Sequence, residues 1–231
     1  MEILFQVLQH GTVVFDLSFW REILSQVLFP MLDNIDLAIQ TPIRKNDESG
    51  VQFYLQTIQQ IVQGFNDFFV RNMDRLGYVI PSYADILVLF ISQTQSRRII
   101  QVLIVCFRQF MQTIASQLSG GQWKDLIFSF SLCFEASLPS GLERELDEFF
   151  GEQNQGKDDS KLDLALSRCM VQLFLINTID NALEISYSKW TVEDTALLLR
   201  CLETSYKFSK TFNSRFELCI KLQRADQQAG L

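Results

Sequence analysis

The sequence has few residues that interrupt helices, since its 231 residues include only 10 Gly and 4 Pro. Long stretches therefore contain no glycine or proline, and 20 Phe supply bulky side chains for a core. A chain of this length buries roughly 70% of the surface that it exposes when unfolded. These features predict a globular protein built from long packed helices.

Histidine is nearly absent, and His10 is the only one. A His-rich zinc site is thereby excluded, and a Ser-His or Cys-His pair would have to use His10, which stands beside Gly11 in a predicted turn. The five cysteines lack C-x-x-C spacing, and each lies in an apolar segment: Cys106, Cys133, Cys169, Cys201 and Cys219. They are typical of buried thiols in a reducing compartment.

Basic residues are outnumbered, with 20 Lys and Arg against 27 Asp and Glu and a formal net charge of -7. This balance argues against nucleic acid as a partner and weakens docking to anionic lipid. The most promising apolar runs lie between Asp85 and Arg97 and between Arg168 and Asp180, and each has eleven uncharged residues. A transmembrane helix needs about 20, so no transmembrane segment is expected.

The amino terminus has no basic region before its apolar residues, because Glu2 stands there instead. A secretory signal is therefore not predicted, and we expect the chain in the cytoplasm or on the cytosolic surface of a membrane.

Sequence signatures of catalysis are missing as well. No G-x-G-x-x-G, G-x-x-x-x-G-K-[ST] or G-x-S-x-G occurs. Neighbouring carboxylates such as Asp158 and Asp159 lie in a polar stretch, without an apolar wall that could raise a pKa for acid catalysis. The sequence therefore predicts no catalytic, cofactor-binding or metal-binding residue, and the chain is not expected to be an enzyme.

Apolar residues recur at three- and four-residue steps over residues 51–76, which predicts an amphipathic helix that ends at Gly77. Pro81 suits the first turn of the next helix. Residues 97–118 are apolar around most of a helix and predict a buried one that ends at the glycines of residues 119–121. Its narrow polar stripe consists of Gln101, Arg108 and Gln112.

Residues 138–160 are polar and acidic, and they predict a flexible insertion between a helical block at 1–137 and a second block at 161–231. A regulatory segment modified at Ser140 or Ser160 is the alternative. In the second block, Thr191 and Asp194 have the spacing of a capping box at a helix start. Aromatic residues interleaved with polar ones at 65–76 and 205–218 fit either core packing or a partner surface.

About eight helices joined by short turns predict an all-α fold, a right-handed α-solenoid of stacked helical hairpins of the armadillo or HEAT kind. A faint internal similarity supports repeats: W-R-E-I-L at 20–24 is similar to W-K-D-L-I at 123–127. Within the first of these helices, Pro30 removes an amide donor and opposes the carbonyl of Gln26. We therefore expect a bend between Gln26 and Pro30.

Several segments also resemble a known family. ILFQVLQHG followed by FWREILSQVLFPMLDNI resembles part of the carboxy-terminal half of the large brefeldin-A-inhibited ARF guanine-nucleotide exchange factors. LGYVIPSYADILVLFISQ, GGQWKDLIFSF, RCMVQLFLINTIDNALE and SYKFSKTFNS resemble later segments in the same order. The matched positions, interpreted as mainly structural, are Phe19, Trp20, Phe29, Pro30, Pro81, Trp123, Asp180, Asn181, Phe208, Phe212, Asn213 and Ser214.

The resemblance implies a helical-repeat region downstream of the catalytic exchange domain, which has no counterpart here. Such a region is associated with autoinhibition, with recruitment to Golgi membranes and with small GTPases. The expected function is a non-catalytic regulatory or scaffold role in Golgi vesicle traffic and protein transport, peripheral on Golgi or trans-Golgi membranes. Its expected partners are GTPases of the ARF or Rab type and neighbouring helical repeats, and no cofactor is expected.

The alternative is a truncated or fragmentary structural module without an independent function. Met1 falls inside the first recognisable helix, whose apolar face would then pack on a preceding repeat. Self-association would follow from exposure of its apolar side chains, which are Ile3, Leu4, Phe5, Val7 and Leu8.

Overall fold

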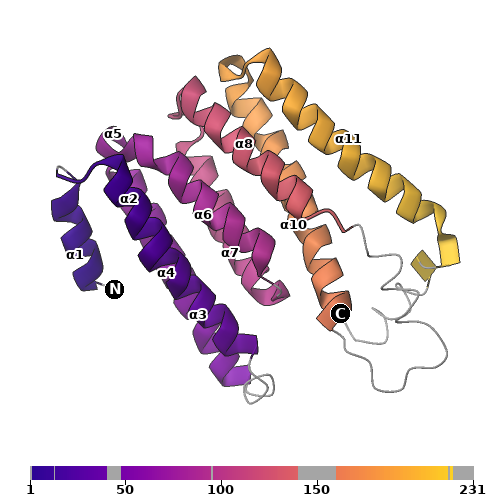
Figure 1. Cartoon of the computed structure of the whole chain (residues 1–231), viewed down its shortest axis with the longest axis horizontal. Helices are drawn as coiled ribbons and strands as arrows, with labels where there is room; N and C mark the ends of the chain where they lie inside the picture. Colours follow the sequence, from indigo (N-terminus) through magenta and orange to yellow (C-terminus); the bar gives the residue numbers. More distant parts are fainter. Residues whose placement is uncertain are drawn as a thin grey trace.

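The computed structural model describes residues 2–12, 14–40, 48–94, 96–139, 160–217 and 219–220. Every regular element in these ranges is a helix (Figure 1). The prediction of an all-α protein is therefore confirmed for the described part of the chain. The longer elements are α1 (Glu2–Gly11), α3 (Phe29–Gln40), α4 (Glu48–Arg71), α6 (Ile80–Gln93), α7 (Arg97–Ile114), α8 (Gly120–Ala136), α10 (Ser160–Ser186) and α11 (Val192–Ser214).

Shorter helical segments join these elements. They are α2 (Leu17–Ile23), the π-helical η1 (Leu24–Leu28), α5 (Met73–Leu76) and the 3-10 turns η2 (Gly77–Val79) and η3 (Tyr187–Lys189).

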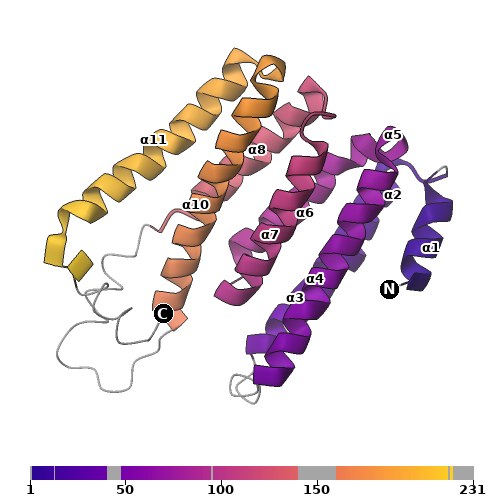
Figure 2. The ribbon, with the colours of Figure 1, turned by 180° about the vertical axis from the view of Figure 1, so that it is seen from behind.

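The helices lie in two layers, as the two opposite views show (Figures 1 and 2). The front layer consists of α2 with η1 and α3, then α6, α8 and α11. The rear layer consists of α4, α7 and α10. Within each layer consecutive members pack side by side, α6 on α8 and α8 on α11 in front, α4 on α7 and α7 on α10 behind. Helix α1 packs on α4 at the amino-terminal end.

The layers are joined by a fully buried tyrosine of α6. The hydroxyl of Tyr83 donates to the side-chain oxygen of Asn66 on α4 at 2.7 Å, and the Asn66 amide donates to the carbonyl of Cys106 on α7 at 3.1 Å. The Tyr83 ring also contacts Phe69, with centroids 4.8 Å apart, and Phe110 at 5.3 Å. One side chain therefore fixes three helices relative to one another.

The two tryptophans of the internal similarity occupy equivalent places. Trp20 and Trp123 are both 0% exposed, in the first turn of a front-layer helix. A capping residue precedes each by four positions: Asp16 accepts from an amide of α2, and Ser119 accepts from an amide of α8. Trp20 packs on Phe68 of α4, whereas Trp123 has its ring 5.6 Å from that of Trp190. The shared motif therefore places an anchoring side chain under the start of a helix.

The backbone around Pro30 stays helical but widens. Residues 24–28 form the π-helix η1, in which the amide of Phe29 donates to the carbonyl of Leu24. Proline lacks an amide hydrogen and its ring clashes with the carbonyl four residues earlier, so a regular α-helical turn is unfavourable at this point. The irregularity overlaps the predicted interval, and it is a wide turn inside a continuing helix rather than an end, so the bend itself stays a prediction.

Two predicted helix ends were wrong. The helix expected over residues 51–76 ends at Arg71, because Asn72 leaves the helix and its side-chain amide donates back to the carbonyl of Phe68 at 2.8 Å. Gly77 instead begins the turn η2. The end of α7 comes at Ile114, four residues before the predicted one, and Gly120 and Gly121 form the first turn of α8.

Other local predictions are confirmed. Pro81 lies in the first turn of α6, and Thr191 and Asp194 form a reciprocal capping box at the start of α11. The exposed stripe of α7 includes Gln101, Arg108 and Gln112. His10, predicted in a turn, lies instead in the last turn of α1.

The aromatic segments differ in their surroundings. Phe65, Phe68 and Phe69 of the first segment are buried in the core. In the second segment Tyr206 is exposed, while Phe208 and Phe212, one helical turn apart, are half-buried. The predicted insertion at 138–160 lies outside the described residues except for 138, 139 and 160, so its character stays a prediction.

One helical stretch satisfies the length and composition of a membrane span. It covers Met73–Gln93, although no span was expected from the uncharged runs of the sequence. Of its most apolar 18 residues, 61% are buried inside the protein. A core helix of a globular protein meets the same criteria. Pro81, Tyr83 and Ala84 are buried in this stretch, so the packing around α6 accounts for its apolar composition.

The five cysteines are free thiols, three buried and two half-buried. Burial raises the pKa of the Cys106 thiol to about 11 and that of Cys133 to about 12. Both stay protonated at neutral pH, and the prediction of buried thiols is confirmed for Cys106, Cys133 and Cys201.

Substitution of Trp123 by alanine tests its anchoring role. Removing a fully buried tryptophan leaves a cavity, so we expect the free energy of unfolding to fall by about 3–5 kcal/mol in urea denaturation followed by circular dichroism. Phe53→Ala is the control, since Phe53 is exposed on α4, and a change within about 0.5 kcal/mol is expected. Equal effects of the two substitutions would contradict the anchoring role.

Candidate interaction surface

The described residues offer little for catalysis. No group of three His, Cys, Asp or Glu side chains among them is placed to hold a metal ion. The ring nitrogen Nδ1 of His10 lies 2.8 Å from the carbonyl of Gln6, so the imidazole is turned toward the backbone of its own helix. The contact places the His10 ring against the last turn of α1.

The family-motif positions of the front layer lie mostly at helix packing contacts. Phe29 is half-buried, with its ring edge-on to Phe90 of α6 at 5.9 Å. Pro81 is buried, and Pro30 is half-buried beside the π-helical turn. Phe19 is 41% exposed and its ring lies 4.1 Å from that of Phe15.

The motif positions of the last two helices are more exposed. Asp180 and Asn181 both face outward on α10, and the Asn181 amide donates to the carbonyl of Asn177 at 2.9 Å. Phe208 and Phe212 stack on each other on α11 at 6.3 Å. Asn213 and Ser214 are exposed at the end of that helix. The matched residues are thus spread along the chain, and the structure does not gather them into one site.

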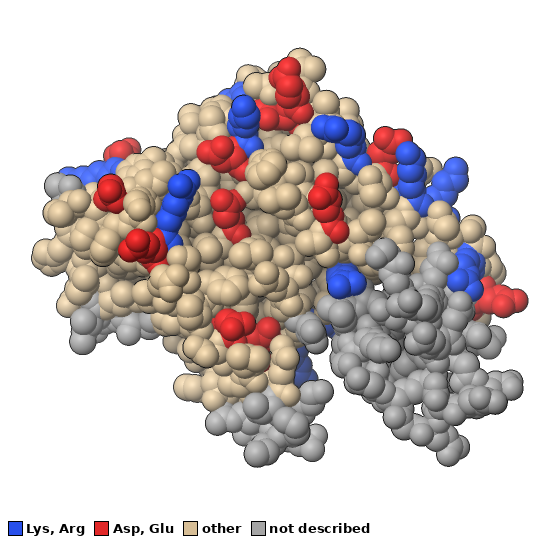
Figure 3. Space-filling model, in the orientation of Figure 1, with Lys and Arg blue, Asp and Glu red and all other residues tan. Residues whose placement is uncertain are grey.

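Charge is also spread out. On the outer face of the front layer, acidic side chains lie over the middle, and most Lys and Arg side chains lie toward the edges (Figure 3). The described residues of this face form no basic patch of the kind that nucleic acid requires.

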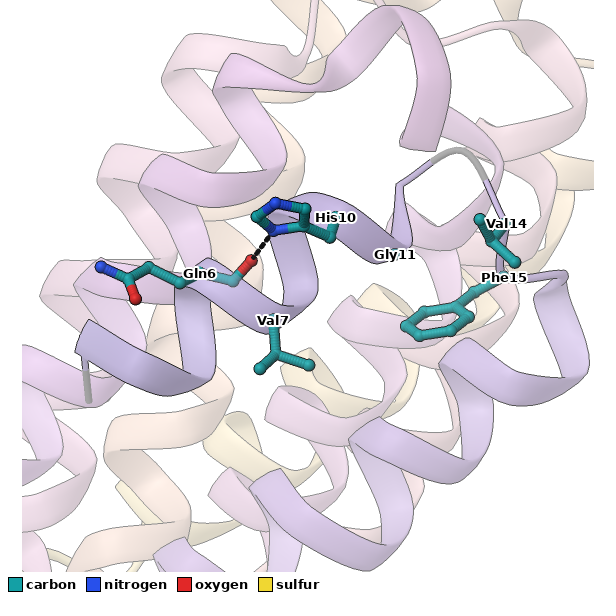
Figure 4. A pocket seen from close by; sticks show the side chains of 6 residues that line it. All are labelled: Gln6, Val7, His10, Gly11, Val14 and Phe15. Atoms are coloured by element: carbon teal, nitrogen blue, oxygen red, sulfur yellow. Dashed lines mark hydrogen bonds between the residues drawn. The ribbon is translucent and has the colours of Figure 1, made fainter.

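One concave surface lies at the amino-terminal end of the layers. It is a hollow of about 500 Å³ between α1 and the turn that follows it, and we call it the amino-terminal hollow (Figure 4). Its lining is mainly apolar and consists of Gln6, Val7, His10, Gly11, Val14 and Phe15.

The turn after α1 closes the hollow on one side. The amides of Val14 and Phe15 donate to the carbonyl of Gly11 at 3.1 and 2.9 Å, which folds the chain back beside its helix. A side chain at position 11 would collide with the Phe15 ring, which lies 2.0 Å from where its Cβ would be. A larger residue at this position would force the Phe15 ring to move.

The opposite face of α1 is attached to α4. The Phe5 ring lies 5.3 Å from Phe65, over Gly64, where a Cβ would come within 2.6 Å of the ring. At the end of the helices the side-chain amides of Gln9 and Asn72 exchange two hydrogen bonds, at 3.2 and 3.3 Å. Helix α1 is thus held by apolar and by polar contacts.

These contacts correct the expected apolar face of the first helix. Leu8 is 2% exposed and Phe5 packs on the core, so neither is available to a partner. Among the side chains described in this part of the chain, Val7 and Val14 are the exposed large apolar ones, at 56% and 78%, and the side chain of Ile3 lies outside that description. Sequence reasoning missed Val14 and Phe15, although the apolar residues at 13–15, which begin two positions after Gly11, were a signal.

The comparisons with known proteins agree with the resemblance in part. The profile of the family described as "BIG2 C-terminal domain" matches residues 170–229. The ADP-ribosylation factor guanine nucleotide-exchange factor sec71 of Schizosaccharomyces pombe is 23% identical over 254 residues, which cover 96% of this chain and 14% of sec71. The chain therefore spans about one seventh of the length of this relative. No solved structure matches the chain.

Substitution of Phe5 by alanine tests the attachment of α1. We expect faster amide hydrogen exchange over residues 4–11 and little change in α7 and α8, because a locally packed helix opens before the whole fold. Val7→Ala is the matched control on the exposed face of the same helix. Faster exchange in Val7→Ala than in Phe5→Ala would contradict the contacts described here.

Proposed function

We propose that this chain is a non-catalytic regulatory or scaffold region of an ARF guanine-nucleotide exchange factor. The observation that carries the proposal is the alignment with sec71, which extends over 96% of this chain but only 14% of that exchange factor. A segment that matches a small, continuous part of a large regulator, and that consists of packed helices, fits a supporting region of such a protein.

A position toward the carboxy terminus of such a factor is supported by the profile match. The matched residues 170–229 include most of α10 and all of α11, and the family description places this domain at the carboxy terminus of its proteins. We infer that the exchange reaction itself is carried out elsewhere, in a domain that the segments matched here do not include.

We infer further that the two layers are part of a right-handed α-solenoid of the armadillo or HEAT kind. Three observations support it. Consecutive helices alternate between the layers, members of one layer pack side by side, and Trp20 and Trp123 occupy equivalent places in separate hairpins. Repeats of this kind bury apolar surface only by stacking on neighbours, so an end surface needs a cover.

The proposed partners are small GTPases of the ARF or Rab type and the neighbouring repeats of the same factor, at Golgi or trans-Golgi membranes. Support for a GTPase partner comes from the name of the relative, which is an exchange factor for an ADP-ribosylation factor. Support for a repeat partner comes from the amino-terminal hollow, whose exposed Val7 and Val14 fit a surface that another helical hairpin covers.

A binding assay and an exchange assay together test the regulatory role. We expect saturable binding of the isolated chain to GTP-loaded ARF in biolayer interferometry, weaker binding to GDP-loaded ARF, and no acceleration of fluorescent GDP release. A panel of Rab proteins loaded in the same way examines the second class of GTPase. Acceleration of GDP release would overturn the non-catalytic role, and a folded chain that binds no GTPase would overturn the GTPase contact.

The alternative, a structural module without independent function, is favoured by the same hollow. It predicts that the isolated chain self-associates and that Val7→Ser with Val14→Ser lowers the concentration-dependent mass in light scattering. Leu173→Ser is the control, because Leu173 is 60% exposed on α10, far along the layers from α1. A monomeric wild-type chain would contradict this alternative.

A further inference from the structure

The outer face of the front layer carries a row of apolar side chains that the fold does not use. Leu89 on α6 is 43% exposed, and Phe128 and Leu132 on α8 are 58% and 51% exposed. Single exposed apolar residues are common on proteins. Three on two adjacent helices form a contiguous patch, and such patches mark sites of interaction.

Two contacts fix the register of α6 and α8 and place these residues together. The Ser129 hydroxyl donates to the carboxylate of Asp85, and the Cys133 thiol lies 3.8 Å from the carbonyl of Val88. Leu89 directly follows Val88, and Leu132 directly precedes Cys133, so both lie at the same level of the helix pair. Phe128 lies one turn before Leu132 on the same face of α8.

Core packing does not account for the patch, because the inward positions of both helices are already filled. Leu87 and Phe90 of α6 are buried, as are Ile127 and Phe130 of α8. Replacing the outward residues by polar ones would leave this core unchanged. Their apolar character therefore points to a contact outside the fold.

Acidic side chains border the patch. Asp85, Asp125 and Glu135 are exposed beside it, and Figure 3 shows acidic side chains over the middle of this face. Burial raises the pKa of Asp85, the Ser129 hydrogen bond and Arg21 lower it, and the nearby Asp125 raises it. The two carboxylates repel each other, and a cation from a partner would relieve that repulsion.

Basic groups border the patch at both of its ends. Arg21 of α2 donates to the hydroxyl of Ser82 at 3.1 Å, and Lys124 stands at the start of α8. At the other end, Glu135 raises and Arg200 of α11 lowers the pKa of the Cys201 thiol, so Arg200 stands near Glu135. Between these ends the apolar side chains lie beside the carboxylates of Asp85 and Asp125.

We propose that this acidic–apolar face of α6 and α8 binds a basic amphipathic helix of another protein. Apolar residues at steps of three and four on one helical face would meet Leu89, Phe128 and Leu132. Lysine or arginine residues flanking that stripe would meet the carboxylates of Asp85, Asp125 and Glu135.

Charge selects this occupant over others. Anionic lipid and nucleic acid would be repelled by the three carboxylates. A second copy docked face to face would oppose the same acidic residues to one another, and like charges across an interface are unfavourable. The inference does not rest on the proposed function, because it concerns a different surface and needs no GTPase.

The test uses the full chain and a designed peptide. The probe is a fluorescent peptide of about 18 residues, leucine on one helical face and lysine beside it, which spans roughly 27 Å as a helix. A second peptide has glutamate in place of lysine, and a third has the first composition in scrambled order. We expect saturable binding of the first peptide alone in fluorescence anisotropy, with an affinity that falls as salt rises.

Variants locate the binding. Phe128→Ser should weaken peptide binding at least tenfold, and Leu132→Ser is a second variant of the same patch should the first fail to fold. Asp125→Lys with Glu135→Lys should weaken binding and reduce its dependence on salt. Phe53→Ser is the matched control, because Phe53 is 63% exposed on the rear layer, and it should leave the affinity unchanged.

Several results would overturn the proposal. One is that Phe53→Ser and Phe128→Ser weaken binding of the lysine peptide equally. Another is that the chain binds the lysine and glutamate peptides with equal affinity. Binding to phosphatidylcholine vesicles that is lost in Phe128→Ser would assign the face to a membrane instead. Dimerisation that is detected by light scattering and is lost in Phe128→Ser would assign the face to a second copy of the chain. GTPase binding that persists in Phe128→Ser would leave the proposed function standing in each case.

Discussion

The buried hydrogen bonds between Tyr83, Asn66 and the carbonyl of Cys106 are the constraint on which the rest of the arrangement depends. Polar groups without water must pair with one another, so α4, α6 and α7 can approach in only one register. The two layers meet at this point. From it the front layer continues through α8 to α11 and the rear layer through α7 to α10, and each added helix inherits its position from the one before.

Local sequence signals predicted local structure well, and tertiary contacts explain where they did not. Thr191 with Asp194 was recognisable as a cap because both partners lie within one turn. The end of α4 was not, because Asn72 leaves the helix in a pairing with Gln9, 63 residues earlier in the chain. No pattern of apolar periodicity contains such a contact, and the glycine at position 77 was a stronger but misleading local signal.

The candidate surfaces were harder to predict than the fold, because exposure depends on which neighbours a helix acquires. Phe5 and Val7 are both apolar residues of α1, yet one covers Phe65 and the other faces the amino-terminal hollow. Likewise, Phe128 is one of several aromatic residues of α8, and only the packing of α6 and α11 on that helix leaves it outside. The sequence marks these residues as apolar, and the stacking of the helices decides which become binding surface.

The π-helical turn before Pro30 has a further consequence for how the first long helix meets the core. Trp20, Leu24, Leu28 and Leu32 are all buried, at strict intervals of four residues. In a regular α-helix each such step rotates the side chain by about 40°, and three steps would carry Leu32 well away from the direction of Trp20. The wide turn holds more residues per rotation and reduces this drift. The buried side chains of this helix thereby stay on one face, in contact with the neighbouring helices along its length.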